Sequence, residues 1–386
     1  MTEWIECTLN KLGEIVGGAT PSTKCEDYYG GSIPWITPKD LSSFKGRYIT
    51  SGERNITEKG LASCSAQMMP KDAVLFTSRA PIGYVAIASQ SVCTNQGFKS
   101  IVVNEKADPL FVYYLLKNNK DAIEAMGSGT TFKEVSGKTM RAVKVRIPLD
   151  VSYQKRIAAV LDSLDTKIEN NERINDNLLA QAQTLYKQFF PYGVQDDLPD
   201  GWRIGTVGEI IEIHDSKRIP LSGADRSKME KKIYPYYGAA SLMDLVDNYI
   251  FDGKYLLLGE DGTVVDDAGY PILQYVWGQF WVNNHAHILT GRLGYDVESL
   301  YMLFKQTPVK SIVTGAVQPK ISQANLRSVQ VVIPPEHNLR EYNDLVEPLF
   351  SLFRANEEEC KTFTALRDTL LPKLMSGEID VSAVQL

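Results

Sequence analysis

The sequence of 386 residues lacks any apolar run approaching 18 residues, and its first residues, 1–12, are polar and acidic rather than basic and then apolar. We therefore expect neither a membrane-spanning helix nor a secretory signal. The five cysteines are scattered, odd in number and without a Cys-x-x-Cys pair. This pattern indicates reduced thiols in a cytoplasmic protein and no structural zinc site.

Motifs for catalysis are missing as well. There is no Gly-x-Gly-x-x-Gly after a strand, no phosphate loop and no Asn-Pro-Pro-aromatic motif of an amino-methyltransferase. Among four histidines only His285 and His287 are close, on one face of an expected strand, and a polar strand face is favoured over a metal pair. Residues 259–263 (GEDGT) with Asp266 and Asp267 could form an acidic centre, but Asp-Gly is foremost a turn signal. We predict no catalytic, cofactor or metal site.

Excess positive charge is also absent, since the net charge is −6. The acidic side chains are concentrated in residues 151–199, 200–336 and 337–386, whereas residues 1–150 are mildly basic. Because phosphate contacts dominate affinity for nucleic acid, a DNA-binding role would need local positive patches or a basic partner protein.

Two long heptad patterns are present, each with alternating spacings of four and three residues, as in helices that pack lengthwise against one another. The first consists of Ile157, Leu161, Leu164, Ile168, Asn171, Asn175, Leu178, Ala182, Leu185 and Phe189. The second consists of Leu345, Leu349, Leu352, Asn356, Glu359, Phe363, Leu366 and Leu370.

Both heptad patterns are polar at their centres. If the helices pair antiparallel and in register, Asn171 and Asn175 meet Asn356 and Glu359, and such buried polar residues fix register at a cost in stability. The alternative is two independent amphipathic helices, each covering its own domain. Pro348 should kink or delay the second helix, so we expect its regular part to begin close to this residue.

The chain repeats itself. Residues 202–211 (WRIGTVGEII) echo 4–15, a strand at 255–258 answers one at 73–77, and 282–289 (VNNHAHIL) answer 94–101. Strands at 83–87, 99–103 and 143–147, and a helix opening at Asp108-Pro109, complete the first copy. The predicted bounds are 1–150 and 200–335 for two mixed domains, 151–190 and 336–375 for the helices, 191–199 for a linker and 376–386 for a tail.

The fold class is therefore α+β. Two mixed α/β domains, related by an approximate two-fold axis, should be separated by a long antiparallel coiled coil of two helices. Such a pair of domains suits a target that is itself two-fold, and duplex DNA is the commonest such target.

Loops rich in small polar and basic residues lie between strands in both copies. Ser, Thr and Lys suit phosphate contacts, whereas Arg, Lys, Asn, Gln and His can address base edges. Plain solvated loops explain any single residue equally well, so the prediction depends on the set recurring twice. The DNA-binding candidates are Thr20, Ser22, Thr23, Lys24, Lys39, Ser78, Arg79, Thr130, Lys133, Ser216, Lys217, Arg218, Tyr237, His285 and Lys320.

Together, these features resemble the DNA specificity subunit of a type I restriction–modification system. The ordered motifs that carry the resemblance include residues 33–37 (IPWIT), 75–83 (LFTSRAPIG), 154–161 (QKRIAAVL), 167–175 (KIENNERIN), 256–262 (LLLGEDG), 281–287 (WVNNHAH) and 367–379 (RDTLLPKLMSGEI). They cover nearly the whole chain.

The resemblance implies two target recognition domains that each read one half of a bipartite, asymmetric DNA site, with the paired helices setting the unread spacer. It also implies two docked modification subunits that bring S-adenosylmethionine and an adenine methyltransferase centre, and restriction/translocase subunits that cleave. The specificity subunit itself would be non-catalytic. Two rival hypotheses are a specificity segment with its own cleavage activity and a coiled-coil scaffold that does not bind DNA.

Overall fold

The computed structural model describes residues 2–129, 133–315 and 317–385. The chain divides into two compact units, the first formed by residues 1–173 with 357–386 and the second by residues 174–356. This division differs from the predicted domain bounds because each unit takes part of both long helices. Each unit is described by itself below.

The first unit is built on a five-stranded sheet of order β2-β9-β6-β7-β5. Its strands are β2 (Gly13–Gly17), β9 (Lys99–Val103), β6 (Val74–Ser78), β7 (Ile82–Ala88) and β5 (Tyr48–Ile49). Two further pairs are β1 (Trp4–Thr8) with β10 (Lys144–Pro148), antiparallel, and β4 (Trp35–Ile36) with β8 (Cys93–Thr94), parallel. The remaining elements are β3 (Tyr29–Ile33), η1 (Leu9–Lys11), η2 (Glu26–Tyr28), α1 (Pro38–Ser42), α2 (Glu58–Ala62), α4 (Lys120–Ala125) and α5 (Gly137–Ala142).

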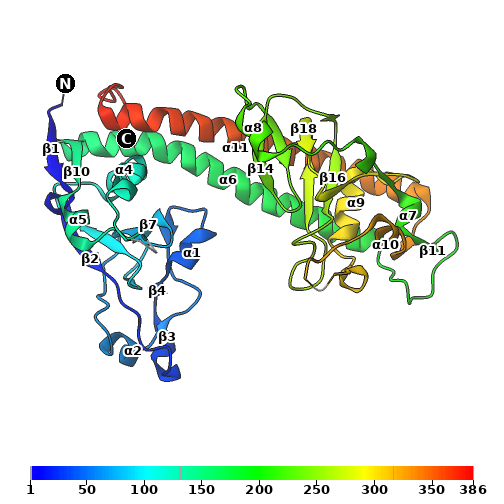
Figure 1. The fold of residues 1–386 in the computed structure, drawn as a ribbon, viewed down its shortest axis with the longest axis horizontal. Coiled ribbons are helices and arrows are strands. Elements are labelled where there is room, and N and C mark those ends of the chain that lie inside the picture. Colours follow the sequence, from blue (N-terminus) through cyan, green and yellow to red (C-terminus); the bar gives the residue numbers. More distant parts are fainter. Residues whose placement is uncertain (1, 130–132, 316, 386) are drawn as a thin grey trace. The chain divides into compact units, whose positions relative to one another are not determined.

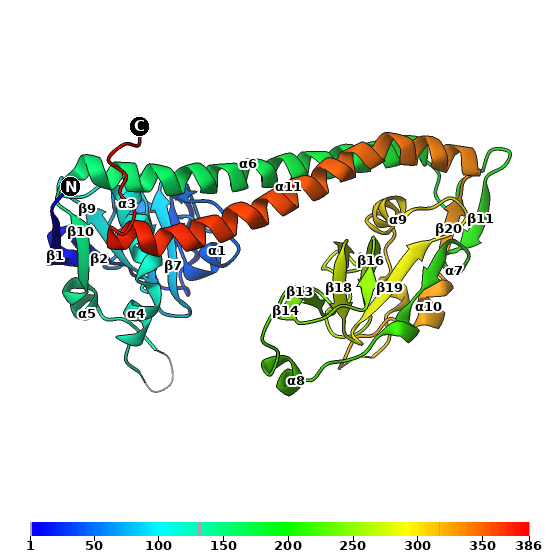
Figure 2. The same ribbon diagram turned by 90° about the horizontal axis from the view of Figure 1, so that it is seen from above.

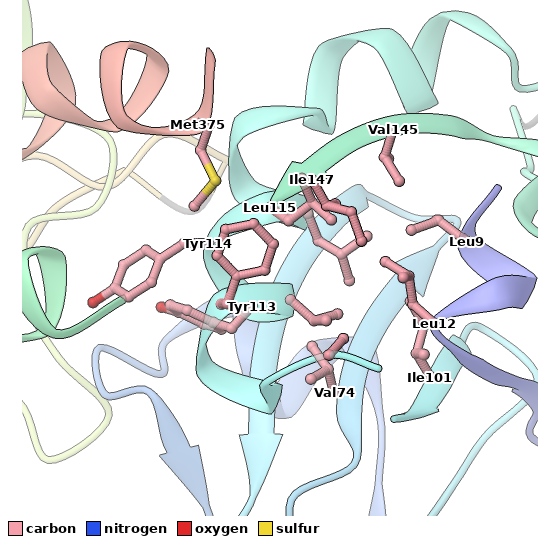
Figure 3. Close-up of a cluster of buried hydrophobic side chains, with 14 of the residues drawn as sticks. Leu9, Leu12, Val74, Ile101, Tyr113, Tyr114, Leu115, Val145, Ile147 and Met375 are labelled. Carbon is pink, nitrogen blue, oxygen red and sulfur yellow. The ribbon is translucent and has the colours of Figure 1, made fainter. Parts of the chain in front are cut away.

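Helix α3 (Pro109–Asn118) packs against this sheet and contributes six buried side chains to the hydrophobic core. The helix begins as predicted, because the Asp108 side chain accepts a hydrogen bond from the Phe111 N–H at 2.9 Å and Pro109 takes the first helical position. Figure 3 shows the resulting apolar cluster, in which Tyr114 and Leu115 of α3 lie among side chains of the strands and Met375.

The second unit repeats this plan. A sheet of order β12-β19-β16-β17 corresponds to β2-β9-β6-β7, the pair β11-β20 corresponds to β1-β10, and the parallel pair β13-β18 corresponds to β4-β8. The strands are β11 (Arg203–Thr206), β12 (Ile211–Ile213), β13 (Tyr234–Tyr237), β14 (Leu242–Val246), β15 (Phe251–Asp252), β16 (Tyr255–Gly259), β17 (Leu273–Val276), β18 (Gln279–Val282), β19 (Ala286–Gly291) and β20 (Gln330–Ile333). The helices are α7 (Val207–Ile210), η3 (Asp215–Lys217), α8 (Gly223–Ser227), α9 (Val297–Phe304), η4 (Lys310–Ile312) and α10 (Gln323–Arg327). The predicted internal repeat of two mixed α/β domains is confirmed.

Two long helices complete the fold, α6 (Val151–Phe189) and α11 (Glu336–Ser376). Figures 1 and 2 show them side by side. In the first unit, Asp165 contacts Arg367 and Asn171 contacts Glu359. In the second unit, Asn175 contacts Asn356 and Ala182 contacts Tyr342. Within each unit the partner number falls as the α6 number rises, so the helices run antiparallel, as predicted.

Each mixed domain is fastened to the long helices by a buried carboxylate. In the first unit, Tyr114 Oη and Arg367 Nη1 each donate to Asp165 of α6 at 2.7 Å. In the second unit, Tyr275 Oη donates to Glu298 Oε1 of α9 at 2.6 Å, and Arg354 Nη1 of α11 donates to the same oxygen at 3.0 Å. Both carboxylates are largely removed from solvent, and each accepts a hydrogen bond from an aromatic hydroxyl and one from an arginine.

The predicted heptad pattern of the second helix is partly wrong. Leu345, Leu352 and Leu366 are 52%, 48% and 44% exposed. The buried face of α11 in the second unit instead consists of Leu339, Tyr342, Val346 and Phe350. The sequence has two apolar stripes in this segment. Helix α11 buries the stripe that contains Tyr342 and Phe350, because these aromatic side chains also fill the core of the domain.

The expectation for Pro348 was also wrong. Helix α11 begins at Glu336 and continues through Pro348. A proline inside a helix costs about 3 kcal/mol because it removes one hydrogen bond and crowds the preceding turn. Pro348 itself is exposed, and the burial of Val346 and Phe350 beside it offsets that cost.

Among the described residues, no helix is long and apolar enough to cross a membrane.

Candidate nucleic-acid interface

In both units, the strand at the centre of the sheet ends against a turn that follows the parallel strand pair. Ser78, at the end of β6, donates its backbone N–H to Gly97 O at 2.7 Å; Glu260, just after β16, donates to His285 O at 2.8 Å. The turn is held in the same way, because an asparagine side chain accepts the N–H two residues later at 2.8 Å, Asn95 from Gly97 and Asn283 from His285. Asn95 and Asn283 are therefore equivalent, as are Gly97 and His285.

A third segment joins the end of each central strand. Val135 N–H donates to Ser78 O at 3.0 Å, and Ile321 N–H donates to Glu260 O at 2.8 Å. We call residues 78–80, 95–97 and 133–135 loop cluster 1, and residues 260–262, 283–285 and 319–321 loop cluster 2. The same backbone bridges link Arg79 to Glu134 and Asp261 to Lys320.

Loop cluster 1 borders an open pocket of about 470 Å³ lined by Thr37, Pro38, Lys39, Arg79, Ala80, Asn95, Gly97 and Glu134. Two predicted DNA-binding residues, Lys39 and Arg79, are thus brought together. Arg79 and Lys99 each lie 3.5 Å from Glu134, whereas Lys39 pairs at 2.7 Å with Glu53 on the surface. Because exposed ion pairs are weak, Lys39 is available to other anions.

Other candidates of the first unit are arranged differently. Ser78 is fully buried and donates its hydroxyl to Gly97 O, so it supports the turn rather than facing solvent. The Thr20 hydroxyl donates to Gln96 Oε1, which attaches its loop to loop cluster 1. The candidates that are exposed on loops are Ser22, Thr23, Lys24 and Lys133. Thr130 lies outside the described residues.

Loop cluster 2 covers a buried ionic network. Arg218 Nη1 donates to Glu260 Oε2 at 2.6 Å and to Ala286 O at 2.8 Å. His287 lies with Nδ1 2.6 Å from Asp215 Oδ2 and with Nε2 2.8 Å from Ile321 O. Arg218 is therefore committed to holding the loops together, and the two predicted histidines differ, since His287 is fully buried and His285 is not.

The network keeps its carboxylates ionised. Burial acts to raise the pKa of Asp215, but the His287 hydrogen bond and charge, the Ile288 N–H and Arg218 outweigh it and lower that pKa. Burial opposes the ionised form of Glu260 in the same way, and its pKa is nevertheless lowered by Arg218, His287 and Lys320.

Asp215, Glu260 and His287 place one ligand atom each within 4.8 Å of one another, which is a possible cation geometry. The side chains of Arg218 and Lys320 already bind these carboxylates, Lys320 at 3.2 Å from Glu260. Since two protein cations balance the two acids, we read the cluster as structural, and the absence of a metal site stays a prediction.

The solvent side of loop cluster 2 presents His285 and Lys320, with side chains 45% and 50% exposed. His285 Nδ1 lies 2.6 Å from Asp261 Oδ1. Tyr237 lies beneath, edge-on to Phe280, and accepts the Asn283 N–H at its carbonyl, so its backbone supports the turn. Ser216 and Lys217 are exposed in η3.

Sequence reasoning missed Asn95, Glu134, Asp261 and Asn283 as interface candidates. The signal for the asparagines was present, because the repeat aligns residues 94–101 with 282–289 and so places Asn95 against Asn283. The pairing of Arg79 with Glu134 depends on a segment far along the chain that contributes one backbone bridge. No local pattern marks it.

This organisation agrees with comparisons to known proteins. The family model described as "Type I restriction modification DNA specificity domain" matches residues 1–180 and again 199–359. The chain therefore belongs to the family of type I restriction–modification DNA specificity subunits, and sequence-specific DNA recognition is its function. The prediction of a non-catalytic specificity subunit is confirmed by this membership and by the relatives' names.

Among its relatives is the type I restriction enzyme MjaIX specificity subunit of Methanocaldococcus jannaschii, 30% identical over 98% of this chain and 94% of that protein. The EcoR124I/EcoR124II specificity subunit of Escherichia coli is 28% identical over 48% of this chain and 46% of that protein. A crystal structure of the type I S subunit from M. genitalium shares the fold with a TM-score of 0.61 at 18% identity, covering 97% of this chain and 96% of that one.

Proposed function

We propose that the two mixed domains each read one half of a bipartite, asymmetric DNA site through their loop clusters. The observation that carries this proposal is the recurrence of one backbone arrangement with different exposed side chains. Arg79 and Glu134 in the first unit correspond to Asp261 and Lys320 in the second. Equivalent scaffolds carrying different hydrogen-bonding groups suit the reading of two different half-sites.

The helices α6 and α11 set the unread spacer in this proposal. Helix α6 runs without interruption through 39 residues and supplies side chains to both units. Its buried polar residues hold one alignment with α11, with Asn171 Nδ2 donating to Glu359 Oε2 at 2.6 Å and Asn356 Nδ2 donating to Asn175 Oδ1 at 2.8 Å. A fixed alignment gives a fixed spacer.

The same helices dock two modification subunits, which bring S-adenosylmethionine and methylate adenine, and restriction/translocase subunits join them, in the cytoplasm. The exposed leucines at 345 and 352, one heptad apart on α11, offer an apolar stripe for such a partner. The net charge of −6 fits this division of labour, because modification subunits would supply much of the positive surface that grips the DNA backbone.

Selection of bound duplexes from a random library by the chain with its modification subunits tests this function. We expect two short conserved elements of different sequence, separated by a fixed unread interval. Sequence-blind binding would favour a scaffold that does not read DNA, and metal-dependent cleavage by the pure chain alone would favour a specificity segment with its own nuclease.

Lengthening both helices tests the role of the coiled coil. One heptad inserted between Asn171 and Asn175, with another at the matching level near Asn356, adds about 10 Å at 1.5 Å per residue. At 3.4 Å per base pair, the spacer should lengthen by about three base pairs while both half-sites stay the same. An unchanged spacer would refute the proposal that the two helices set its length.

A further inference from the structure

Loop clusters 1 and 2 have opposite charge at two of their equivalent positions. Arg79 is replaced by Asp261, Glu134 by Lys320, Ser78 by Glu260 and Gly97 by His285, as the shared backbone hydrogen bonds define. The reversal is not a simple exchange of one ion pair, because the partners differ: Arg79 pairs with Glu134, whereas Asp261 pairs with His285 and Lys320 with Glu260.

Loop cluster 1 presents hydrogen-bond donors. Its one acid, Glu134, lies 3.5 Å from both Arg79 and Lys99, and the side chain of Arg79 is about one third exposed at the pocket that it shares with Lys39. The contact between Arg79 Nη1 and Glu134 Oε2 is long, at 3.5 Å, so most of the five N–H donors of the Arg79 guanidinium are left for a ligand.

Loop cluster 2 presents an acceptor. Glu260 is taken up by Arg218 and Lys320, but Asp261, whose side chain is 18% exposed, contacts only His285, through Oδ1, among the ion pairs of the described residues. A carboxylate has about four lone-pair positions, so Asp261 can accept further hydrogen bonds while His285 fixes its orientation. The position equivalent to Arg79 is occupied by Asp261, so loop cluster 2 offers a carboxylate where loop cluster 1 offers a guanidinium.

We propose that these equivalent positions determine specificity by opposite chemistry: Arg79 donates to the O6 and N7 acceptors of a guanine in the half-site of the first unit, and Asp261 accepts from the exocyclic amino group of cytosine or adenine in the other half-site. This rests on the proposed function. In the major groove, guanine offers two acceptors that match an arginine fork, whereas cytosine N4 and adenine N6 offer donors to a carboxylate.

The test measures affinity of the complex with its modification subunits for every single-base variant of the selected duplex, for wild type and for R79K and D261N. R79K keeps the charge and loses the fork. We expect it to lose roughly 5- to 150-fold of discrimination at one guanine in one half-site. Replacing that guanine with 7-deazaguanine should weaken wild type and leave R79K almost unaffected.

D261N should lose discrimination at one base pair of the other half-site only. Whether that base is cytosine or adenine identifies which amino group is read. The matched controls are K71A, an exposed lysine before β6 at the opposite end of the strand from Arg79, and D267N, an exposed aspartate outside loop cluster 2. Both should keep the wild-type base profile.

Two outcomes overturn the proposal. An equal loss of affinity on all duplexes would make Arg79 a phosphate contact, and an unchanged base profile in R79K or D261N would remove that residue from base reading. E134Q, which frees Arg79 from its carboxylate, should retain the guanine preference and so separates base reading from loop stability. Sequence-blind binding by wild type would instead defeat the proposed function itself.

Discussion

The paired asparagines of the second unit allow a quantitative test of how the two long helices are aligned. Asn175 is 3% exposed and Asn356 is 8% exposed, and Asn356 Nδ2 donates to Asn175 Oδ1 at 2.8 Å. Replacing either one with leucine, which has a similar volume, leaves the other amide facing an apolar side chain. Replacing both removes the mismatch.

The expected magnitude follows from the burial of the pair. Leaving one buried amide group without its partner costs about 1–3 kcal/mol, whereas exchanging both partners for apolar groups is nearly neutral or stabilising. We therefore expect N175L and N356L each to be less stable than the double variant by about 2 kcal/mol. The coupling energy of the double-mutant cycle should be at least about 1 kcal/mol.

Urea unfolding of all four proteins, followed by circular dichroism, measures these differences. N177L serves as the control, because Asn177 lies on the same helix but is exposed, and its effect should stay within about 0.5 kcal/mol. If the effects of N175L and N356L simply add, the two amides do not depend on each other and the alignment has another cause.

Three further predictions concern other contacts. D165A should lower the free energy of unfolding by about 3–5 kcal/mol, measured by urea unfolding, because the 2.7 Å ion pair with an arginine and a buried tyrosine hydroxyl both lose their partner; a loss below 1 kcal/mol would refute this. The pKa values of Asp215 and Glu260 are lowered in the folded state, so both carboxylates stabilise the fold at any pH above their unfolded pKa values, and this stabilisation should be lost as the pH falls through their folded pKa values. In D215N/E260Q, the free energy of unfolding should therefore fall less steeply with decreasing pH; an unchanged slope would contradict this. L345S/L352S should weaken the binding of modification subunits at least tenfold, measured by calorimetry, without changing the free energy of unfolding of this chain. Equal affinity would exclude these two leucines as the docking surface.

Local signals in the sequence were sufficient for much of the fold. The α3 start was predictable because Asp108 and Pro109 act on the next few residues, and the recurrence of the same elements in the second domain followed from the repeat. The polar centres of the helices were also visible, since Asn171 and Glu359 interrupt apolar patterns, and these two side chains are in contact. Such features depend on neighbours in the chain or on periodicity.

The rest depended on contacts that are distant in sequence. Arg218 was a reasonable DNA-binding candidate until its partners at Glu260 and Ala286 were known, because nothing near it marks a buried role. Leu352 belonged to an apolar stripe that could have faced either way, and the domain core decided the choice in favour of the stripe that contains Phe350. Periodicity identifies a face but not its partner.

The most direct test of bipartite reading is methylome sequencing of cells that express this chain with its modification subunit, beside cells in which residues 1–150 come from another family member. The account predicts one asymmetric motif of two elements with a fixed unread spacer, and the exchange should alter one element only. A single continuous motif, or a change in both elements, would contradict it.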